Sequence, residues 1–326
     1  MKQSTRTRFT ALALSSACGL LATSAGATDV SMRISWLMNV QNAGYVMAVD
    51  KGYFKEAGIN VEIAPGGPNI NSTTMIASGQ NTFGTNDVSA LLFGKAEGMD
   101  LVAVAACLQK NPSGVLSLAE KGIKTPKDLE GKTLAYNEGG PWTYTQAMLN
   151  KAGVDMSKVK TVVAIGNEVL MNGNVDAKTA FVVNEPIALE VQGYKTATLV
   201  PADYGVNAYA EVIFAKRDFV EKNYDLVKTY VAAVAKGWDY ALKHQDEAVA
   251  AVMKLNPELN PEQQKRQLAM QEGFIRSDDT EKNGLCSIDE AKFEDSYQIL
   301  KKYGGLTADI DIKSIVMPEF NAGAAK

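Results

Sequence analysis

Short apolar runs alternate with helical patterns along the first two thirds of the chain, and this alternation constrains the fold more than any other feature. Helical patterns over 43–58, 72–79, 88–98, 143–153 and 185–193 each end in glycine, and from Asp218 onward the chain is helical apart from a break at NPELNP. The sequence therefore predicts an α/β fold with largely parallel sheets. The runs typical of strands cover residues 32–38, 59–65, 82–86, 101–109, 115–120, 132–137, 160–165, 177–183, 196–201 and 210–216.

Two changes in composition divide the chain. One lies at LQKNPSG, residues 108–114, and the other at ADYGVNAYAE, residues 202–211. A chain of this length is expected to form more than one lobe. We interpret the two segments as crossings between a discontinuous first lobe, 28–110 plus 211–326, and a second lobe, 111–210.

The first residues have the pattern of an export signal. Lys2, Arg6 and Arg8 precede a short apolar run over 9–21, and Ala25-Gly26-Ala27 resembles a cleavage site. Such a run is too short to span a membrane as a helix. We expect residues 1–27 to be a signal peptide and the protein to be periplasmic; the alternative is lipid attachment at Cys18.

Charge excludes several classes of partner. Removal of residues 1–27 takes away three basic residues and no acidic one, so the net charge changes from −4 to −7. Nucleic acids and anionic lipids attract Lys- and Arg-rich surfaces, so neither is expected as a partner. No later apolar run is long enough to cross a membrane.

Cysteine and histidine are scarce in the remaining chain. Cys107 and Cys286 are either a long-range pair or two buried thiols, and the apolar surroundings of Cys107 favour the thiols. The single histidine, His244, lies near the end of an amphipathic pattern and is expected on a solvated helix face. No group of residues has the spacing of a metal site, and no metal or other cofactor is expected.

Polar and aromatic side chains cluster where the predicted strands end. Ligands of open α/β sheets bind at the carboxyl ends of strands, so these positions are the candidate ligand-binding residues. They are Trp36, Asn39, Asn42, Asn69, Asn86, Asp87, Gln109, Asn137, Trp142, Tyr144, Asn184, Glu185 and Tyr204.

The candidates are mostly amides, carboxylates and aromatics, with few cations. This inventory suits a planar nitrogen heterocycle, because Asp87 and Glu185 can accept from N–H groups and Trp142 can stack on the ring. A sulfonate or nitrate would instead require a cation, for which Lys110 and Lys216 are the nearest choices.

Each candidate also has a structural interpretation. Asn and Asp at a strand-to-helix junction are favoured as helix caps, and Asn71 and Asp87 are good examples. Trp142 could pack between elements without touching a ligand. Glu185 is followed by Pro186 at a first helical position, which holds its carboxylate near the strand end. Trp238, in the strongest helical segment, is expected in the core.

Several motifs resemble one family. WLMNVQNAGYVMAVDKGYFKEAGINVEI, PGGPN, ASGQNTFGTND, IKTPKDLEGKTLAY and VVNEP resemble the periplasmic solute-binding proteins of ABC importers that are related to the thiamine-pyrimidine synthases. The resemblance covers nearly all of the chain after residue 27. The W-L-x-N-x-x-x-A-G pattern and N-E-P are most similar to the pyrimidine and riboflavin receptors, which often carry His where this chain has Asn42.

The resemblance implies a type II-like periplasmic binding protein with a hinge and an interlobe cleft. Its ligand would lie between Asn39, Asn42, Asn86 and Asp87 on one lobe and Trp142 and Glu185 on the other. Such a protein would be a monomeric receptor rather than an enzyme, and would deliver a thiamine pyrimidine precursor, a riboflavin-like solute or a nucleobase-like solute to a permease and its ATPase. The alternatives are an anion receptor of the same family, a pyrimidine synthase, and a sensor without transport.

Overall fold

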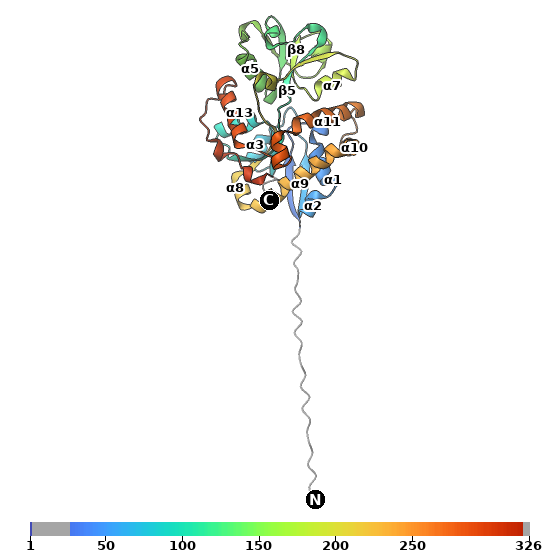
Figure 1. The fold of residues 1–326 in the computed structure, drawn as a ribbon, viewed down its shortest axis with the longest axis vertical. Helices are drawn as coiled ribbons and strands as arrows, with labels where there is room; N and C mark the ends of the chain where they lie inside the picture. Colours follow the sequence, from blue (N-terminus) through green and yellow to red (C-terminus); the bar gives the residue numbers. More distant parts are fainter. Residues whose placement is uncertain (2–26, 322–326) are drawn as a thin grey trace.

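The described chain forms two lobes, each built on a five-stranded mixed sheet (Figure 1). This computed structural model describes residues 27–321 together with Met1, so nearly all of the predicted signal peptide lies outside the described residues. The strands are β1 (Thr28–Arg33), β2 (Ile59–Ala64), β3 (Phe83–Asn86), β4 (Leu101–Leu108), β5 (Ser113–Leu118), β6 (Thr133–Tyr136), β7 (Lys160–Val163), β8 (Ala177–Phe181), β9 (Thr196–Leu199) and β10 (Ala210–Lys216).

Helices connect the strands and form nearly all of the last third of the described chain. The first lobe and the crossings hold α1 (Ala43–Asp50), α2 (Tyr53–Glu56), α3 (Ser72–Ala77), α4 (Val88–Ala96), α8 (Arg217–Lys222), α9 (Tyr224–Lys243), α10 (Gln245–Leu255), α11 (Pro261–Ile275), α12 (Asp278–Asn283) and α13 (Glu290–Tyr303). The second holds α5 (Gly140–Lys151), α6 (Glu168–Met171) and α7 (Glu185–Glu190). The predicted break at 256–261 separates α10 from α11.

The sheets are mixed, so the expectation of largely parallel pairing was wrong. The first lobe has the order β2-β1-β3-β10-β4, in which β10 runs antiparallel to both neighbours. The second has the order β7-β6-β8-β5-β9, in which β5 is antiparallel to both neighbours. The two antiparallel strands, β5 and β10, are the first strands after the crossings. The chain passes from the first sheet to the second between β4 and β5, and returns between β9 and β10.

Each predicted strand overlaps an observed strand, but β1 lies earlier than expected. It ends at Arg33, and Trp36 to Met38 lie in an irregular segment. The predicted helix over 43–58 is broken at Gly52, whose φ of +75° belongs to the left-handed region that glycine favours. Gly58 ends α2 at a φ of +72°, as the sequence predicts.

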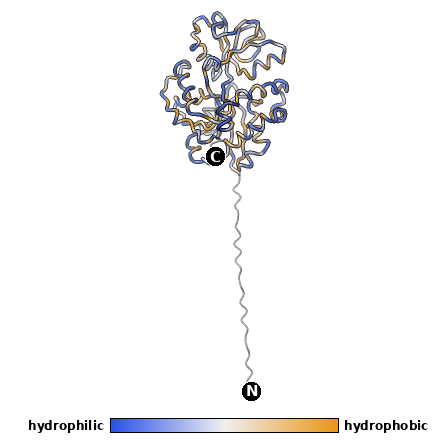
Figure 2. The backbone as a smooth tube through the Cα atoms, viewed as in Figure 1, coloured by the Kyte–Doolittle hydropathy of each residue, from blue (hydrophilic) through white to orange (hydrophobic). Residues whose placement is uncertain are grey.

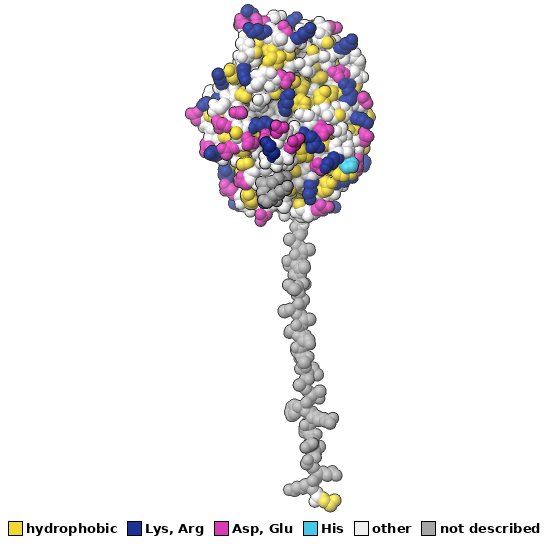
Figure 3. Space-filling model, in the orientation of Figure 1, with side chains coloured by type: hydrophobic (Ala, Val, Ile, Leu, Met, Phe, Trp, Pro, Cys, Tyr) yellow, Lys and Arg dark blue, Asp and Glu magenta, His cyan; other side chains and the backbone are white. Residues whose placement is uncertain are grey.

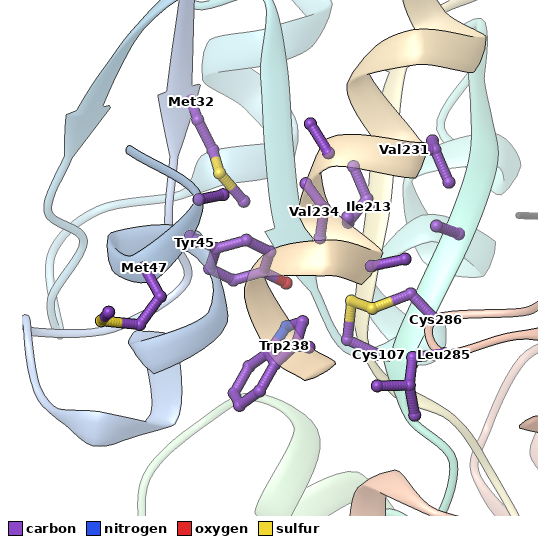
Figure 4. Packing of buried hydrophobic residues seen from close by; sticks show 14 of the residues in the cluster. Met32, Tyr45, Met47, Cys107, Ile213, Val231, Val234, Trp238, Leu285 and Cys286 are labelled. Carbon is purple, nitrogen blue, oxygen red and sulfur yellow. A yellow bond between two sulfur atoms is a disulfide. The ribbon is translucent and has the colours of Figure 1, made fainter. Parts of the chain in front are cut away.

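Helices cover both faces of each sheet. α1 and α9 pack together on one face of the first sheet, and Trp238 of α9 is fully buried there with its ring edge-on to Tyr45, as expected of a core residue (Figure 4). The apolar cluster on the opposite face joins α4 and α13 to α5 of the second lobe. Outer turns of both lobes are mostly hydrophilic (Figure 2).

Cys107 and Cys286 form a disulfide, so the favoured interpretation as buried thiols was wrong (Figure 4). The bond joins β4 to the segment between α12 and α13, and both residues are fully buried. Their separation of 179 residues explains why local sequence did not identify the pair.

Candidate functional site

The three amides that follow β1 have three different roles. Asn39 caps a short 3-10 helix (Val40–Asn42) by accepting from the Gln41 backbone N–H at 2.8 Å. The side chain of Gln41 donates to a carboxylate oxygen of Glu211 at 2.5 Å. Asn42 is 1% exposed, and neither its side-chain oxygen Oδ1 nor its side-chain nitrogen Nδ2 has a hydrogen-bond partner. Asn42 is therefore the amide free to bind something else.

Glu211 lies beside these amides and was not among the predicted site residues. It is the second residue of β10, is 2% exposed and accepts from Ser35 Oγ at 3.0 Å as well as from Gln41. Its other oxygen, Oε2, has no partner, and its φ of +50° is rare for a residue with a side chain. A glutamate beside the apolar run VIFA was the only signal in the sequence.

Asp87 follows β3 at the N-cap position of α4, but its side chain makes no capping bond. Its Oδ1 accepts from Asn111 Nδ2 at 3.0 Å, and its backbone N–H donates to Asn86 at 2.9 Å. The cap interpretation thus fails for Asp87, whereas Asn71 does cap α3 by accepting from Thr74 N–H at 3.0 Å. Burial, followed by the nearby Glu211 carboxylate, raises the pKa of Asp87 to about 7.

Asn111 lies in the first crossing and was also missed by sequence reasoning. Besides Asp87, its side chain contacts the second crossing, where Nδ2 donates to the carbonyl of Tyr209 at 3.3 Å. Its Oδ1 accepts from the backbone N–H of Ser113 at 2.8 Å. One buried side chain therefore connects both crossings to the Asp87 carboxylate.

In the second lobe, helix α5 presents its N-terminus to Asp87. A Cβ added to Gly140 would lie 1.6 Å from Asp87 Oδ2, so the carboxylate lies directly against the helix backbone. Trp142, in the first turn of α5, is 8% exposed and stacks on Tyr136 with 4.1 Å between ring centroids. One face of the predicted stacking residue is therefore covered by the protein itself. Asn137, which follows Tyr136 in the sequence, is partly exposed.

Two further predicted residues of the second lobe lie at the start of α7. Asn184 Oδ1 accepts from Gln263 of α11 at 2.8 Å, so it contacts the first lobe. Glu185 accepts from the Phe181 backbone N–H at 3.0 Å, and burial raises its pKa despite the nearby Lys178. Lys178 is 6% exposed, and burial lowers the pKa of its ammonium group. Nothing in the local sequence pattern predicted a buried lysine there.

The lobes are in direct contact. Tyr144 of α5 accepts from the Ser89 backbone N–H at the start of α4 at 3.1 Å, so this predicted residue is an interlobe contact. On the other flank Arg266 of α11 pairs with Glu190 of α7. Asp87 lies on the first-lobe side of this interface, against Gly140.

The remaining candidates lie elsewhere. Trp36 joins the segments after β1 and β2, because its carbonyl accepts from Gly66 N–H at 2.9 Å, and Asn69 is exposed nearby. Gln109 donates to the carbonyls of Ala106 and Ser287 next to the disulfide. Tyr204 lies beside Gly205, which accepts from Lys151 at the far end of α5 from Gly140. The structure does not bring Gln109 or Tyr204 next to Asp87.

An open hollow of about 550 Å³ lies behind the crossings rather than between the strand ends. Lys110 lines it and pairs with Asp203 at 3.1 Å. Lys216 ends β10 and pairs with Leu101 at the start of β4, at the opposite end of the first sheet from Glu211. Neither lysine is next to Asp87. On the face shown in Figure 3, basic and acidic side chains are intermixed.

Within residues 27–321, no group of three or more His, Cys, Asp or Glu side chains is placed to hold a metal ion. None of the helices described is both long enough and apolar enough to cross a bilayer. His244 is exposed and stacks on Tyr240, as expected of a solvated helix end.

Comparison with known proteins gives one family. The family described as NMT1/THI5 like matches residues 39–248, more than half of the chain, and this span contains Asp87, Asn111 and Glu211. The formylaminopyrimidine-binding protein of Halalkalibacterium halodurans is 26% identical over 71% of this chain and 72% of its own. The riboflavin-binding protein RibY of Chloroflexus aurantiacus is 26% identical over 91% and 87%.

Other relatives carry a different description. A 4-amino-5-hydroxymethyl-2-methylpyrimidine phosphate synthase of Saccharomyces cerevisiae is 28% identical over 70% of this chain and 72% of its own. Among solved structures, the periplasmic aliphatic sulphonate binding protein SsuA of Escherichia coli aligns with a TM-score of 0.70 at 16% identity, covering 90% of this chain and 99% of that one. This structural likeness establishes the two-lobed binding-protein fold.

Proposed function

Because the chain belongs to the NMT1/THI5-like family, we propose that it is the extracytoplasmic solute-binding receptor of an ABC importer. Its solute is a small N-heterocycle, of the class of thiamine pyrimidine precursors, riboflavin-like compounds or nucleobases. The relatives named for formylaminopyrimidine and riboflavin support this class.

One observation carries the proposal: the Asp87 carboxylate of the first lobe lies against the α5 N-terminus of the second. Asn42, with two unpartnered buried polar atoms, lies in the same lobe as Asp87. Carboxylate and amide groups at strand ends suit a ring that has both N–H donors and nitrogen acceptors. Trp142 and Glu185 are the proposed second-lobe contacts.

The proposed receptor opens and closes about its two crossings. The lobe boundaries follow them, with 28–110 and 211–326 in one lobe and 111–210 in the other. A solute bound between the lobes favours the closed form, which a permease and its ATPase recognise. Export and cleavage after residue 27 place the receptor in the periplasm.

Binding is better supported than catalysis. The two cysteines of the described chain are joined to each other, and His244 is exposed on the surface of the first lobe. Neither arrangement gives a nucleophile or a general base next to Asp87. The anion-receptor alternative has weak support as well, because Lys110 is paired with Asp203 and Lys216 lies at the other end of the sheet.

A thermal-shift screen of the chain from residue 28 tests the proposal. Pyrimidines, flavins, purines, aliphatic sulfonates and nitrate are compared at equal concentration. A ligand at a hundred times its Kd stabilises the folded state by about 2.7 kcal/mol, which raises the melting temperature by several degrees. Stabilisation by sulfonates or nitrate alone would overturn the proposed ligand class.

A further inference from the structure

Two buried carboxylates lie near enough to interact electrostatically where β3 and β10 end their pairing. The antiparallel register pairs Val212 with Asn86, so Glu211 lies opposite Asp87. Asp87 is 9% exposed and Glu211 is 2% exposed. We call Asp87 and Glu211 the acidic pair.

The groups that contact the acidic pair are uncharged. Asn111 donates to Asp87, and Ser35 and Gln41 donate to Glu211. Among residues 27–321, no Lys, Arg or His forms an ion pair with either carboxylate. Buried carboxylates are normally balanced by a cation, since an unpaired charge is costly to remove from water.

The titratable side chains facing the pair are also acids. Tyr144 of α5 interacts electrostatically with Asp87, and Tyr45 of α1 with Glu211. Burial raises the pKa of each tyrosine, so both stay uncharged near neutral pH. The protein therefore supplies hydrogen bonds and, at Asp87, the partial positive charge of the α5 N-terminus, but no cationic side chain.

Glu211 and a residue in the segment that contacts it both have unpartnered polar atoms. Glu211 Oε2 has no hydrogen-bond partner, and neither polar atom of Asn42 has one. Asn42 directly follows Gln41, whose side chain binds the other oxygen of Glu211. Buried polar groups are nearly always satisfied, so these atoms are available to hydrogen-bond to a ligand.

Resting on the proposed receptor function, we propose that the site selects organic cations, whose positive charge is balanced by the acidic pair. Suitable ligands are heterocycles that carry an ammonium group, an amidinium group or a protonated ring nitrogen. Asn42 then contacts the ring edge. The charge of the solute, rather than the ring alone, determines affinity.

Binding of a cation should change the number of protons held by the acidic pair. Burial and then Glu211 raise the pKa of Asp87 to about 7, and burial raises that of Glu211. A bound cation favours the ionised carboxylates and lowers both pKa values. Cation binding near pH 7 therefore releases protons, whereas binding of an uncharged analogue does not.

Isothermal titration with matched probes tests this. The first pair is 4-amino-5-aminomethyl-2-methylpyrimidine, an ammonium ion at pH 7, and its uncharged hydroxymethyl counterpart. The second pair is benzamidinium and benzamide. Comparison of their affinities measures the charge preference even if neither pyrimidine binds. Each titration is repeated in buffers of different ionisation enthalpy to count the protons released.

We expect the charged member of a pair to bind about tenfold or more tightly, as for a desolvated charge contact. Glu211→Gln and Asp87→Asn should reduce this ratio, and the matched control Glu97→Gln, an exposed carboxylate at the other end of α4, should leave it unchanged. Proton release is measured on the unaltered protein, so the test does not depend on the variants folding.

Two results would overturn the inference. If both pyrimidines bind equally and no proton is released, the acidic pair is a structural feature sharing protons, and the receptor function stands. If no probe of either pair binds while a flavin or a purine stabilises the protein, the cation preference fails and the receptor function again stands. Failure of every compound in the wider screen overturns both proposals.

Discussion

The backbone of Gly140 and the carboxylate of Asp87 lie so close that a Cβ on residue 140 would be 1.6 Å from Oδ2. The two residues belong to different lobes, and each follows a strand of its own sheet. This contact between the lobes therefore depends on the absence of a side chain at residue 140.

Gly140→Ala should oppose closure. The added methyl group collides with Asp87 only when the lobes are together, so the open form is favoured and the affinity for the best ligand of the screen should fall at least about tenfold. Isothermal titration measures the loss. Gly273→Ala is the matched control, because the space around that helical glycine is empty, and it should bind as the unaltered protein does. Equal affinity in the two variants would falsify this account.

Asn111→Ala should loosen the crossings. The substitution leaves Asp87 Oδ1 and the Tyr209 carbonyl without their buried donor, which costs about 1–3 kcal/mol of the free energy of unfolding. Urea denaturation measures the change. Asn150→Ala removes an exposed interlobe bond to Tyr303 and is expected to cost less than about 0.5 kcal/mol. Similar losses in both variants would count against a special role for Asn111.

Loss of the disulfide should destabilise the protein strongly. Cys107 and Cys286 close a loop of 179 residues, and the chain-entropy relation gives about 5 kcal/mol for a loop this long. Thermal melting with and without dithiothreitol measures the effect. The double variant Cys107→Ala/Cys286→Ala should melt lower and should not respond to dithiothreitol. An unaltered protein that is equally insensitive to the reductant, and as stable as the variant, would show that the cysteines are not paired in solution.

Asp87→Asn should change how stability depends on pH. The folded-state pKa of about 7 lies above the ordinary 3.8, so the folded protein holds a proton that the unfolded chain releases. The stability of the unaltered protein should therefore fall as pH rises from about 4 to 7, by up to roughly 1.4 kcal/mol per pH unit from this group. Asparagine cannot ionise, so the variant should gain stability over the unaltered protein across that range.

Urea denaturation at several pH values between 4 and 8 measures this difference. Glu97→Gln, at an exposed position, provides the matched control. Its free energy of unfolding should differ from that of the unaltered protein by the same amount at every pH. If Asp87→Asn also differs from the unaltered protein by a constant amount, the Asp87 carboxyl does not titrate near neutral pH in the folded state.

Local patterns in the sequence were sufficient for the fold class. Periodicity and the glycines that end helices indicated an overlapping segment for every observed strand, and the break before Pro261 was expected. The same patterns could not give strand direction, because a buried strand has the same apolar pattern in parallel and antiparallel pairing. The sheets were therefore expected to be more parallel than they are.

The sequence by itself determined the alternation of elements and placed Asp87 directly after a strand, whereas Asn42 lies in a 3-10 helix well beyond the end of β1. Only the tertiary structure decided their partners. The antiparallel return of β10 brings Glu211 opposite Asp87, and the first crossing brings Asn111 to the same carboxylate. Hydrogen bonds, burial and pKa shifts depend on neighbours that are distant in the chain. The chemistry of the site therefore follows from the pairing of strands and lobes rather than from any local motif.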